Sequence, residues 1–361
     1  MNIHFVNNKT KFIAMALSLY FFFVSIKLMG ISLGIFSDDM ASSIIETATN
    51  PFIALFIGIL STTLLQSSSA STSIMVGLVA AGIIDLTTVI PMIMGANIGT
   101  TVTNIIASLA HLPTRAEFGK AFSAAVVHDF FNVLTVLVLF PIEMTFHIIE
   151  NTAIFCAELF VGLGGITFVS PVSIIVKPSA NYLASLLGMD ALTILVASLF
   201  IFFASLTAMV TIMKTLVVEK SKKILDSHFF KNDTTAFFTG TGITMLVQSS
   251  SISTSLMVPL VGTGMIKLRK AFPYMIGSNL GTTITAIMAA LVIGTPLALS
   301  VAFAHSIFNF FGMLIFMPLR EIPIRLAEMF GELARKYRRV AIGYLITAFY
   351  IIPAILVFFV R

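Results

Sequence analysis

Residues 66–103 read QSSSASTSIMVGLVAAGIIDLTTVIPMIMGANIGTTVT, and residues 248–285 read QSSSISTSLMVPLVGTGMIKLRKAFPYMIGSNLGTTIT. The two stretches are related by a constant shift of 182 residues, and 21 of their 38 positions are identical. The likeness resumes at a shift of 177, where residues 128–132 (HDFFN) align with residues 305–309 (HSIFN). A polar linker rich in serine and threonine does not explain this repetition. The chain therefore contains an internal structural repeat.

The composition around this repeat is that of a membrane protein. Of 361 residues, 58% are hydrophobic and only 10% are charged, whereas soluble domains carry about 25% charged residues. Residues 12–36 hold one charged side chain (Lys27), and residues 271–319 hold no Asp, Glu, Lys or Arg. Apolar runs of about 20 residues are long enough to cross a bilayer. We therefore expect a multi-pass protein of the cell membrane, inner or plasma.

Three further features of the sequence agree with this class. The net charge of +5 comes from basic residues in short loops, as the positive-inside rule expects, and does not indicate a nucleic-acid surface. The single cysteine, Cys156, excludes an internal disulfide and cannot form a structural metal site alone. The first apolar run lacks a short, cleavable signal pattern, so we expect it to be a retained helix.

Loop charges predict that the two repeats run in opposite directions through the membrane. In the first repeat, the loop near Asp85 is acidic, and the loop at residues 111–120 carries Arg and Lys. In the second repeat, residues 267–270 carry three basic side chains, and residues 294–297 carry none. Because Lys and Arg bias a loop to the cytoplasm, the pattern is reversed between the halves. The repeats are predicted to be inverted.

The same charges predict where the QSSS motifs lie. Residues 37–50 and the Asp85 loop both look external, whereas residues 214–231 and 267–270 both look internal. Each QSSS segment thus begins and ends on one side, which favours a re-entrant hairpin over two full crossings. Non-helical backbone at membrane depth is tolerated where it is buried in protein or lines a cavity. Two hairpin tips meeting near the midplane would form one site reachable alternately from either side.

The predicted fold is an all-α polytopic membrane protein with two inverted repeats, each containing a re-entrant hairpin and broken transmembrane helices. We expect a first repeat at 12–140 (helix 12–36, external hairpin 52–84, helices 89–110 and 121–140), an external or interfacial connector at 141–189, a second repeat at 190–319 (helix 190–213, internal hairpin 234–266, helices 271–293 and 298–317), and a basic cytoplasmic segment with a final helix (340–360) at 320–361. Residues 151–188 are predicted to form an interfacial or hairpin segment.

The serine-rich tips have the chemistry of an anion site. Hydroxyl groups beside exposed backbone N–H groups at a helix end offer several donors and the positive end of a helix dipole. The side chains concerned are Ser67, Ser68 and Ser69 with Ser249, Ser250 and Ser251, and the amides of Gln66 and Gln248, which suit an oxyanion or a cation. Small residues also let helices pack closely, and for Ser71, Ser73, Ser253 and Ser255 that alternative stays open.

Two further groups of residues suit sodium. Residues 95–101 and 277–283 are expected to interrupt their helices, and the oxygens of Asn97, Asn279, Thr100 and Thr282 with freed carbonyls are ligands of the kind sodium prefers. Asp129 is the one carboxylate in a predicted span and is a functional candidate. A sodium ligand is its preferred role, and a partner for Lys27 is the alternative. His128 and His305 fit packing or hydrogen bonding better than proton transfer.

The motifs together resemble the type II sodium-dependent phosphate cotransporter family, as a bacterial-type member. The resemblance rests on the paired QSSS motifs, on MGANIGTTVTN and IGSNLGTTITA, on AVVHDFFNVLTVLVLFPIE and on EIPIR, and it covers about residues 16 to 355. It implies sodium-driven import of divalent phosphate by a symporter. It places Ser67, Thr100, Ser249 and Ser250 at phosphate and Gln248, Thr282, Thr285, Asp129 and Asn132 at sodium. Asp at position 129 implies electrogenic transport, with three sodium ions for each phosphate.

The chain departs from animal members of that family in its short external connector, its single cysteine and its end at Arg361. Rival hypotheses are a sodium-coupled carboxylate or other anion transporter and an ion channel. The first commonly uses a fixed Arg for its carboxylate, and no Arg lies in a predicted span. HExxH, GxSxG and P-loop motifs do not occur, so no enzyme is predicted. We expect no cofactor besides sodium as the coupling ion, and phosphate, sodium and the lipid bilayer as partners, with no nucleic acid.

Overall fold

The computed structural model describes residues 8–48, 50–162, 171–224 and 230–359, and every regular element in them is a helix. The first half comprises α1 (Asn8–Ala48), α2 (Pro51–Leu65), α3 (Ser68–Ala80), α4 (Leu86–Thr100), α5 (Val102–Ser108), η2 (Leu109–His111), α6 (Arg115–Phe146), α7 (Ile148–Gly162) and α8 (Pro171–Leu186). The second half comprises α9 (Ala191–Ile224), α10 (Asp233–Val247), α11 (Ser250–Ser255), α12 (Met257–Gly262), α13 (Leu268–Ile293), α14 (Pro296–Phe316), α15 (Glu321–Lys336), α16 (Arg339–Ile346), the π-helical turn η3 (Thr347–Ile351) and α17 (Ile352–Phe359).

Seven helical stretches among the described residues are long and apolar enough to cross a membrane. They are Thr10–Leu33, Leu86–His111, Arg115–Phe146, Ala191–Met209, Leu268–Ile293, Pro296–Phe316 and Arg339–Phe358. Each overlaps one of the seven spanning helices predicted from the sequence. The chain is an all-α polytopic membrane protein, and this part of the prediction is confirmed.

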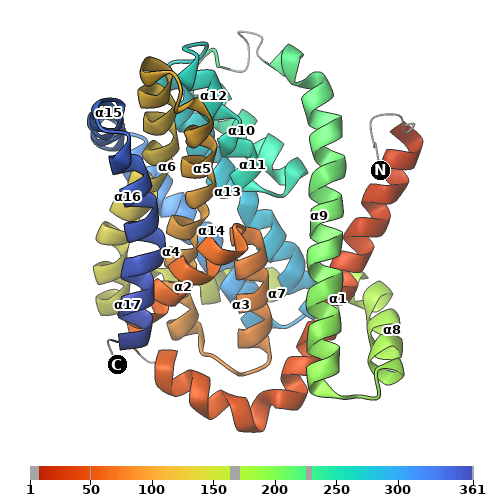
Figure 1. The fold of residues 1–361 in the computed structure, drawn as a ribbon. Coiled ribbons are helices and arrows are strands. Elements are labelled where there is room, and N and C mark those ends of the chain that lie inside the picture. The colour runs from red at the N-terminus through yellow and green to blue at the C-terminus, as the bar shows by residue number, and fades with distance from the viewer. Residues whose placement is uncertain (1–7, 49, 163–170, 225–229, 360–361) are drawn as a thin grey trace.

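Both QSSS motifs lie at the turn of a pair of short helices (Figure 1). α2 and α10 have 15 residues each, about 22 Å at 1.5 Å per residue, which is shorter than the roughly 30 Å of a hydrocarbon core. Gln66 ends α2 and Gln248 ends α10, both in the left-handed region with φ of 52° and 56°. α3 then leads toward the end of the molecule where α8 and the C-terminus lie, whereas α12 leads toward the opposite end. That the pairs are membrane hairpins entering from opposite sides remains a proposal.

The repeat is reproduced in the way these short helices pack. α2 lies against α4, and α10 lies against α13, with backbone against backbone. A Cβ added at Gly99 would lie 2.5 Å from the Ile59 carbonyl oxygen, and one at Gly281 would lie 2.5 Å from the Thr241 carbonyl oxygen. The same close approach occurs at further glycines, each related to its partner by the shift of 182: Gly58 with Gly240, and Gly95 with Gly277. Small residues are what allows helix backbones in membranes to approach so closely.

The two halves differ where broken helices were predicted. The helix of residues 86–108 is interrupted at Thr101, whereas α13 runs unbroken through residues 277–283, so the predicted second break is wrong. The polar partners at this position differ between the halves. The Thr101 hydroxyl lies 2.9 Å from Asp129 Oδ1 as well as 2.7 Å from Ile98 O, whereas its equivalent, Thr283, bonds its own helix at Leu280 O (2.8 Å). At the position equivalent to Asp129, Ser306 instead donates to its own helix at Ala302 O.

The connector between the repeats contains two helices, α7 and α8, that pack against different parts of the protein. α6 continues six residues past the predicted boundary at residue 140, and α7 packs against α14 and α4. α8 packs against α1 (Figure 1). Residues 163–170 of the connector lie outside the described residues. Its location relative to the bilayer therefore stays a prediction.

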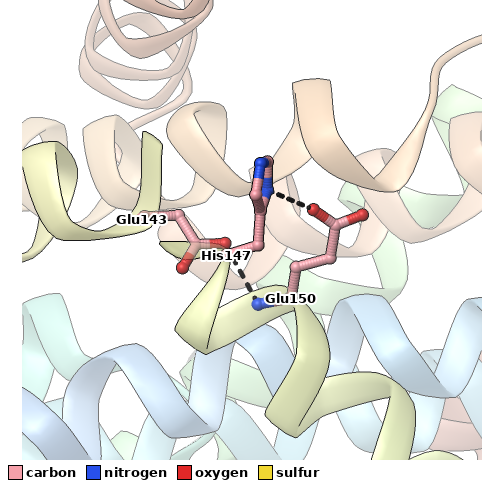
Figure 2. A group of neighbouring side chains, drawn as sticks. All are labelled: Glu143, His147 and Glu150. Atoms are coloured by element: carbon pink, nitrogen blue, oxygen red, sulfur yellow. Dashed lines mark hydrogen bonds and ion pairs between the residues drawn. The ribbon is translucent and has the colours of Figure 1, made fainter. Parts of the chain in front are cut away.

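A buried carboxylate joins α6 to α7 (Figure 2). The Glu143 oxygens accept hydrogen bonds from the backbone N–H groups of Ile149 (2.6 Å) and Glu150 (3.0 Å). His147 lies between the helices with φ of 50°, and its Nδ1 is 2.9 Å from Glu150 Oε2. Glu143, His147 and Glu150 offer ligand atoms within 4.8 Å of one another. Because both Glu143 oxygens already satisfy the first turn of α7, we interpret the group as a helix junction.

Candidate functional site

The two QSSS turns contact each other through crossed hydrogen bonds. Ser69 Oγ donates to the Gln248 carbonyl oxygen (3.2 Å), and Ser251 Oγ donates to the Gln66 carbonyl oxygen (3.4 Å). Each of these bonds is the other's counterpart under the shift of 182. Both serines are buried, with exposed fractions of 2% and 5%. The structure thus brings the two tips together, as the sequence predicts.

The serines before these contacts begin α3 and α11. Ser67 Oγ accepts a hydrogen bond from Ala70 N (3.2 Å), and Ser249 Oγ accepts one from Ile252 N (3.4 Å). As N-caps, both hydroxyls keep their own protons available for an acceptor. Ser68 and Ser250 are the first residues of α3 and α11 and are buried. Two helix N-termini with four such hydroxyls therefore lie where the tips meet, an arrangement suited to an oxyanion.

A buried amide network links the two halves beside the tips. His128 Nε2 lies 2.6 Å from Asn279 Oδ1, and Asn279 Nδ2 donates to Asn132 Oδ1 (2.7 Å). Asn132 Nδ2 in turn donates to the Asn97 carbonyl oxygen (2.7 Å). The network thus ties α6 to α13 and α4. The expectation that His128 forms a hydrogen bond to a neighbouring helix is confirmed.

The same histidine connects the network to the second tip. His128 Nδ1 lies 3.2 Å from Asn104 Nδ2, and Asn104 Oδ1 accepts from Thr254 Oγ1 on α11 (3.0 Å). In the second repeat, Ala286 stands at the position equivalent to Asn104, and neither ring nitrogen of His305 has a hydrogen-bond partner. The two halves therefore share a backbone arrangement but carry an asymmetric polar site.

Asp129 is held apart from this network. It is buried, with an exposed fraction of 1%, and its carboxylate accepts hydrogen bonds from Thr101 Oγ1 and from the Tyr344 hydroxyl. It also lines a cavity of about 230 Å³ together with Tyr344 and Phe349 from the last span. Among the described residues Lys27 forms no ion pair with it; the Lys27 ammonium instead donates to Ile293 O. The alternative of an Asp129–Lys27 pair is therefore wrong.

Two of the residues assigned to sodium offer oxygens without a hydrogen-bond partner. Gln248 Oε1 and Thr285 Oγ1 are both buried and unpaired. Since buried polar oxygens are nearly always satisfied by protein, water or an ion, they fit a cation ligand set. Thr282 Oγ1 lies 2.9 Å from Ser69 Oγ and so joins the tips to α13.

Two other predicted residues turn their side chains to their own helix. Thr100 Oγ1 donates to Ala96 O (2.8 Å), and Asn97 Nδ2 donates to Ile93 O (2.8 Å). Asn97 joins the network through its backbone carbonyl only. The structure therefore brings the tip serines, both glutamine carbonyls and Thr282 into one group. The asparagines form a second group. Among the described residues, the Thr100 hydroxyl bonds neither group.

Sequence reasoning missed several polar residues at the site. Tyr344 donates to Asp129, and Thr254 Oγ1 donates to Ser250 O (2.8 Å), whereas Asn104 joins Thr254 to His128. Thr62 and Thr244, equivalent positions one turn before the glutamines, add buried unpaired hydroxyls. The repeat itself was the signal for Thr62 and Thr244, because the shift of 182 aligns them. Tyr344 lies outside the repeat and gave no signal.

Fold and site define the class: a polytopic membrane protein with a duplicated core and a buried polar centre of the kind found in transporters. A sequence profile of the Na+/Pi-cotransporter family matches residues 21–168 and 201–349. The chain belongs to this family, which the sequence motifs predicted.

Similar proteins include sodium-dependent phosphate transport protein 2B from Pongo abelii and from Homo sapiens, each 31% identical over 93% of this chain and 63% of the relative. Sodium-dependent phosphate transport protein 2A from Rattus norvegicus is 30% identical over 93% of this chain and 66% of the relative. The chain thus spans somewhat less than two thirds of the length of these relatives. No solved structure matches significantly.

Proposed function

We propose that the protein is a symporter that imports inorganic phosphate together with sodium by alternating access. The observation that carries this proposal is the pair of crossed bonds from Ser69 to Gln248 O and from Ser251 to Gln66 O. It gathers hydroxyl donors and two helix N-termini at one buried point. Among the described residues, no Arg forms a hydrogen bond with the residues of the QSSS turns. An oxyanion bound there would therefore be held by neutral donors and helix dipoles, with sodium as the counter-charge.

Sodium is assigned to the neutral oxygens around the tips. Gln248, Thr282 and Thr285 would form one ligand group on the second repeat, and Asn132 and Asn279 lie in the adjacent network. Asp129 would hold a sodium ion whose positive charge is matched by the carboxylate, which supports electrogenic transport of the divalent form. These assignments agree with the family membership and with the names of the similar proteins, which are sodium-dependent phosphate transporters.

The proposal of alternating access rests on the prediction, made from loop charges, that the two repeats are inverted. Charge is distributed unevenly: the loop between α12 and α13 is basic, and α15, with Arg325, Arg335 and Lys336, lies at the same end (Figure 1). The α3–α4 loop at the other end carries Asp85. By the positive-inside rule, the basic end faces the cytoplasm, so the first tip would be approached from outside and the second from inside.

Competition during transport tests the substrate. Purified protein in proteoliposomes takes up radiolabelled phosphate under an inward sodium gradient, and unlabelled arsenate, succinate or aspartate is added outside. We expect arsenate alone to inhibit, because it matches the tetrahedral oxyanion. Inhibition by a carboxylate, with sodium-driven uptake of that carboxylate, would keep the fold and overturn the substrate.

A further inference from the structure

Among the described residues, the Asp129 carboxylate has one donor that no other acceptor shares, and this donor comes from the last span. The Tyr344 hydroxyl on α16 donates to Asp129 Oδ2. The other oxygen, Oδ1, lies 2.9 Å from Thr101 Oγ1, but that hydroxyl has a single proton and lies closer, at 2.7 Å, to the Ile98 carbonyl oxygen. Removing the Tyr344 hydroxyl would therefore leave the carboxylate with a share of one proton.

The ring that carries this hydroxyl is fixed by aromatic contacts. Phe330 of α15 meets it edge to face with ring centroids 5.0 Å apart, and Phe349 of η3 does the same at 6.0 Å. Phe330 also contacts Phe122 and Phe130 of α6, at 5.8 Å each. Edge-to-face pairs are a preferred arrangement of aromatic rings. Because Asp129 lies on α6 as well, these rings hold the hydroxyl at a fixed place relative to the carboxylate.

An apolar cavity lies beside the bond between the two side chains. Its volume is about 230 Å³, enough for several water molecules at about 30 Å³ each. Apart from Asp129 and Tyr344, every lining residue is apolar, including Val133 and Ala348. Without the tyrosine hydroxyl, the lining would offer the carboxylate no other side-chain donor, and the carboxylate could turn about its Cβ–Cγ bond, which is a broad torsion in Asp. The hydroxyl therefore fixes the direction in which the carboxylate points.

A simpler role for the bond is to fasten the last span, because a buried tyrosine hydroxyl usually finds an acceptor. That span has other attachments, however, since η3 and α17 both lie against α2. At the position equivalent to Asp129 in the second repeat, Ser306 donates to its own helix. The contact with the last span thus accompanies the carboxylate and is not a feature of both repeats.

We propose that Tyr344 is a positioning residue for sodium: it orients the Asp129 carboxylate and thereby sets the sodium affinity of the transporter. This inference rests on the proposed role of Asp129 as a sodium ligand. Tyr344 acts through the carboxylate and does not itself hold the ion. The last span, which follows both repeats in the sequence, thus takes part in sodium binding.

Two sodium titrations test this role. Tyr344→Phe removes the hydroxyl and keeps the ring, and Tyr350→Phe in the same span is the matched control, because the Tyr350 hydroxyl forms no hydrogen bond with a described residue. The first titration measures phosphate uptake at saturating phosphate, and the second measures the melting temperature of the solubilised protein without phosphate, with choline replacing sodium. We expect Tyr344→Phe to raise the half-saturating sodium concentration roughly twofold to tenfold in both, the range for immobilising one side chain. The phosphate concentration for half-maximal uptake at saturating sodium should stay unchanged, as should both titrations of Tyr350→Phe.

Combination with Asp129→Gly shows whether the tyrosine acts through the carboxylate. Adding Tyr344→Phe to Asp129→Gly should leave the remaining sodium dependence of the melting temperature unchanged. An equal rise in half-saturating sodium with and without Asp129 would assign the effect to a loosened last span and overturn the proposal. So would an unchanged sodium titration of Tyr344→Phe, or tighter sodium binding, which would show that the hydroxyl competes with the ion.

Failure of the proposed transport function gives a different result. Unmodified protein that is stabilised by sodium but takes up no phosphate would contradict phosphate transport and leave the role of Tyr344 standing. Sodium-driven phosphate uptake that Tyr344→Phe does not alter would contradict the role of Tyr344 alone. Unmodified protein that responds to sodium in neither titration would overturn both.

Discussion

Replacing Asn132 by alanine removes the centre of the network that joins the two repeats. Asn132 accepts from Asn279 Nδ2 and donates to the Asn97 carbonyl, both at 2.7 Å and both buried. Its equivalent in the second repeat, Asn309, is equally buried, but its Nδ2 donates only to the carbonyl of His305 in its own helix (2.9 Å). The two substitutions delete the same atoms from equivalent positions and differ in the bonds between helices.

The expected cost follows from those bonds. Two interhelical bonds at an average of about 0.6 kcal/mol each in membrane proteins give roughly 1.2 kcal/mol, and two buried groups left without partners at about 1–3 kcal/mol each give roughly 2–6 kcal/mol. We expect Asn132→Ala to lower the free energy of unfolding by about 2 kcal/mol more than Asn309→Ala, since both substitutions delete the same atoms from a fully buried position.

The assay is denaturant unfolding of both variants in the same detergent, followed by sodium titration of phosphate uptake. We expect Asn132→Ala to raise the sodium concentration for half-maximal uptake, because Asn279 loses its support, and Asn309→Ala to leave it near that of the unmodified protein. Equal destabilisation by the two variants would refute the view that the network, and not the loss of a buried side chain, holds the halves together.

Four other predictions follow from single positions. Asp129→Gly should lower the charge moved per phosphate by about one elementary charge while some uptake remains; an unchanged current per phosphate, recorded with labelled uptake, would remove Asp129 from the sodium ligands. Ser250→Ala should weaken phosphate uptake without reducing the amount of protein in the membrane, which immunoblotting checks, and normal uptake would exclude it from the site. Gly281→Ala should reduce the yield of folded protein in size-exclusion chromatography, because its Cβ would meet the Thr241 carbonyl oxygen at 2.5 Å; a normal yield would show that α10 and α13 can separate. Arg269 bonds Glu321 (Nη2–Oε2 2.7 Å) and lowers the pKa of that carboxyl below its usual value, so its small contribution to stability is present at neutral pH and lost as the pH falls through that lowered pKa. Glu321→Gln should therefore flatten the thermal stability profile at acidic pH, and an unaltered profile would contradict the pairing.

Much of this fold is predictable because the residues that form the turns and the close helix contacts are repeated in the sequence. The paired glycines at positions 99 and 281 and the QSSS turns occupy equivalent places in both helix pairs, so aligning the halves also aligns their packing. The contact between the tips followed from the same symmetry. Local chemistry and duplication thus reinforce each other in these segments.

The parts that escaped prediction depend on contacts between distant residues. Nothing in residues 95–101 distinguishes them from residues 277–283 as helix breakers, and the break at Thr101 coincides with a hydrogen bond to Asp129 on another helix. Tyr344 reaches that carboxylate from the last span, 215 residues away in sequence. The partner of Lys27 likewise proved to be a carbonyl on α13, which no pattern near Lys27 indicates.

Simultaneous flux of labelled sodium and labelled phosphate into one population of proteoliposomes tests the central claim most directly. The account predicts that phosphate accumulates above its external concentration under a sodium gradient, that sodium uptake rises when phosphate is added, and that replacing sodium by potassium stops both. Phosphate flux that is unaffected by sodium, or sodium flux that is unaffected by phosphate, would contradict the coupling of the two ions at the site where the QSSS turns meet.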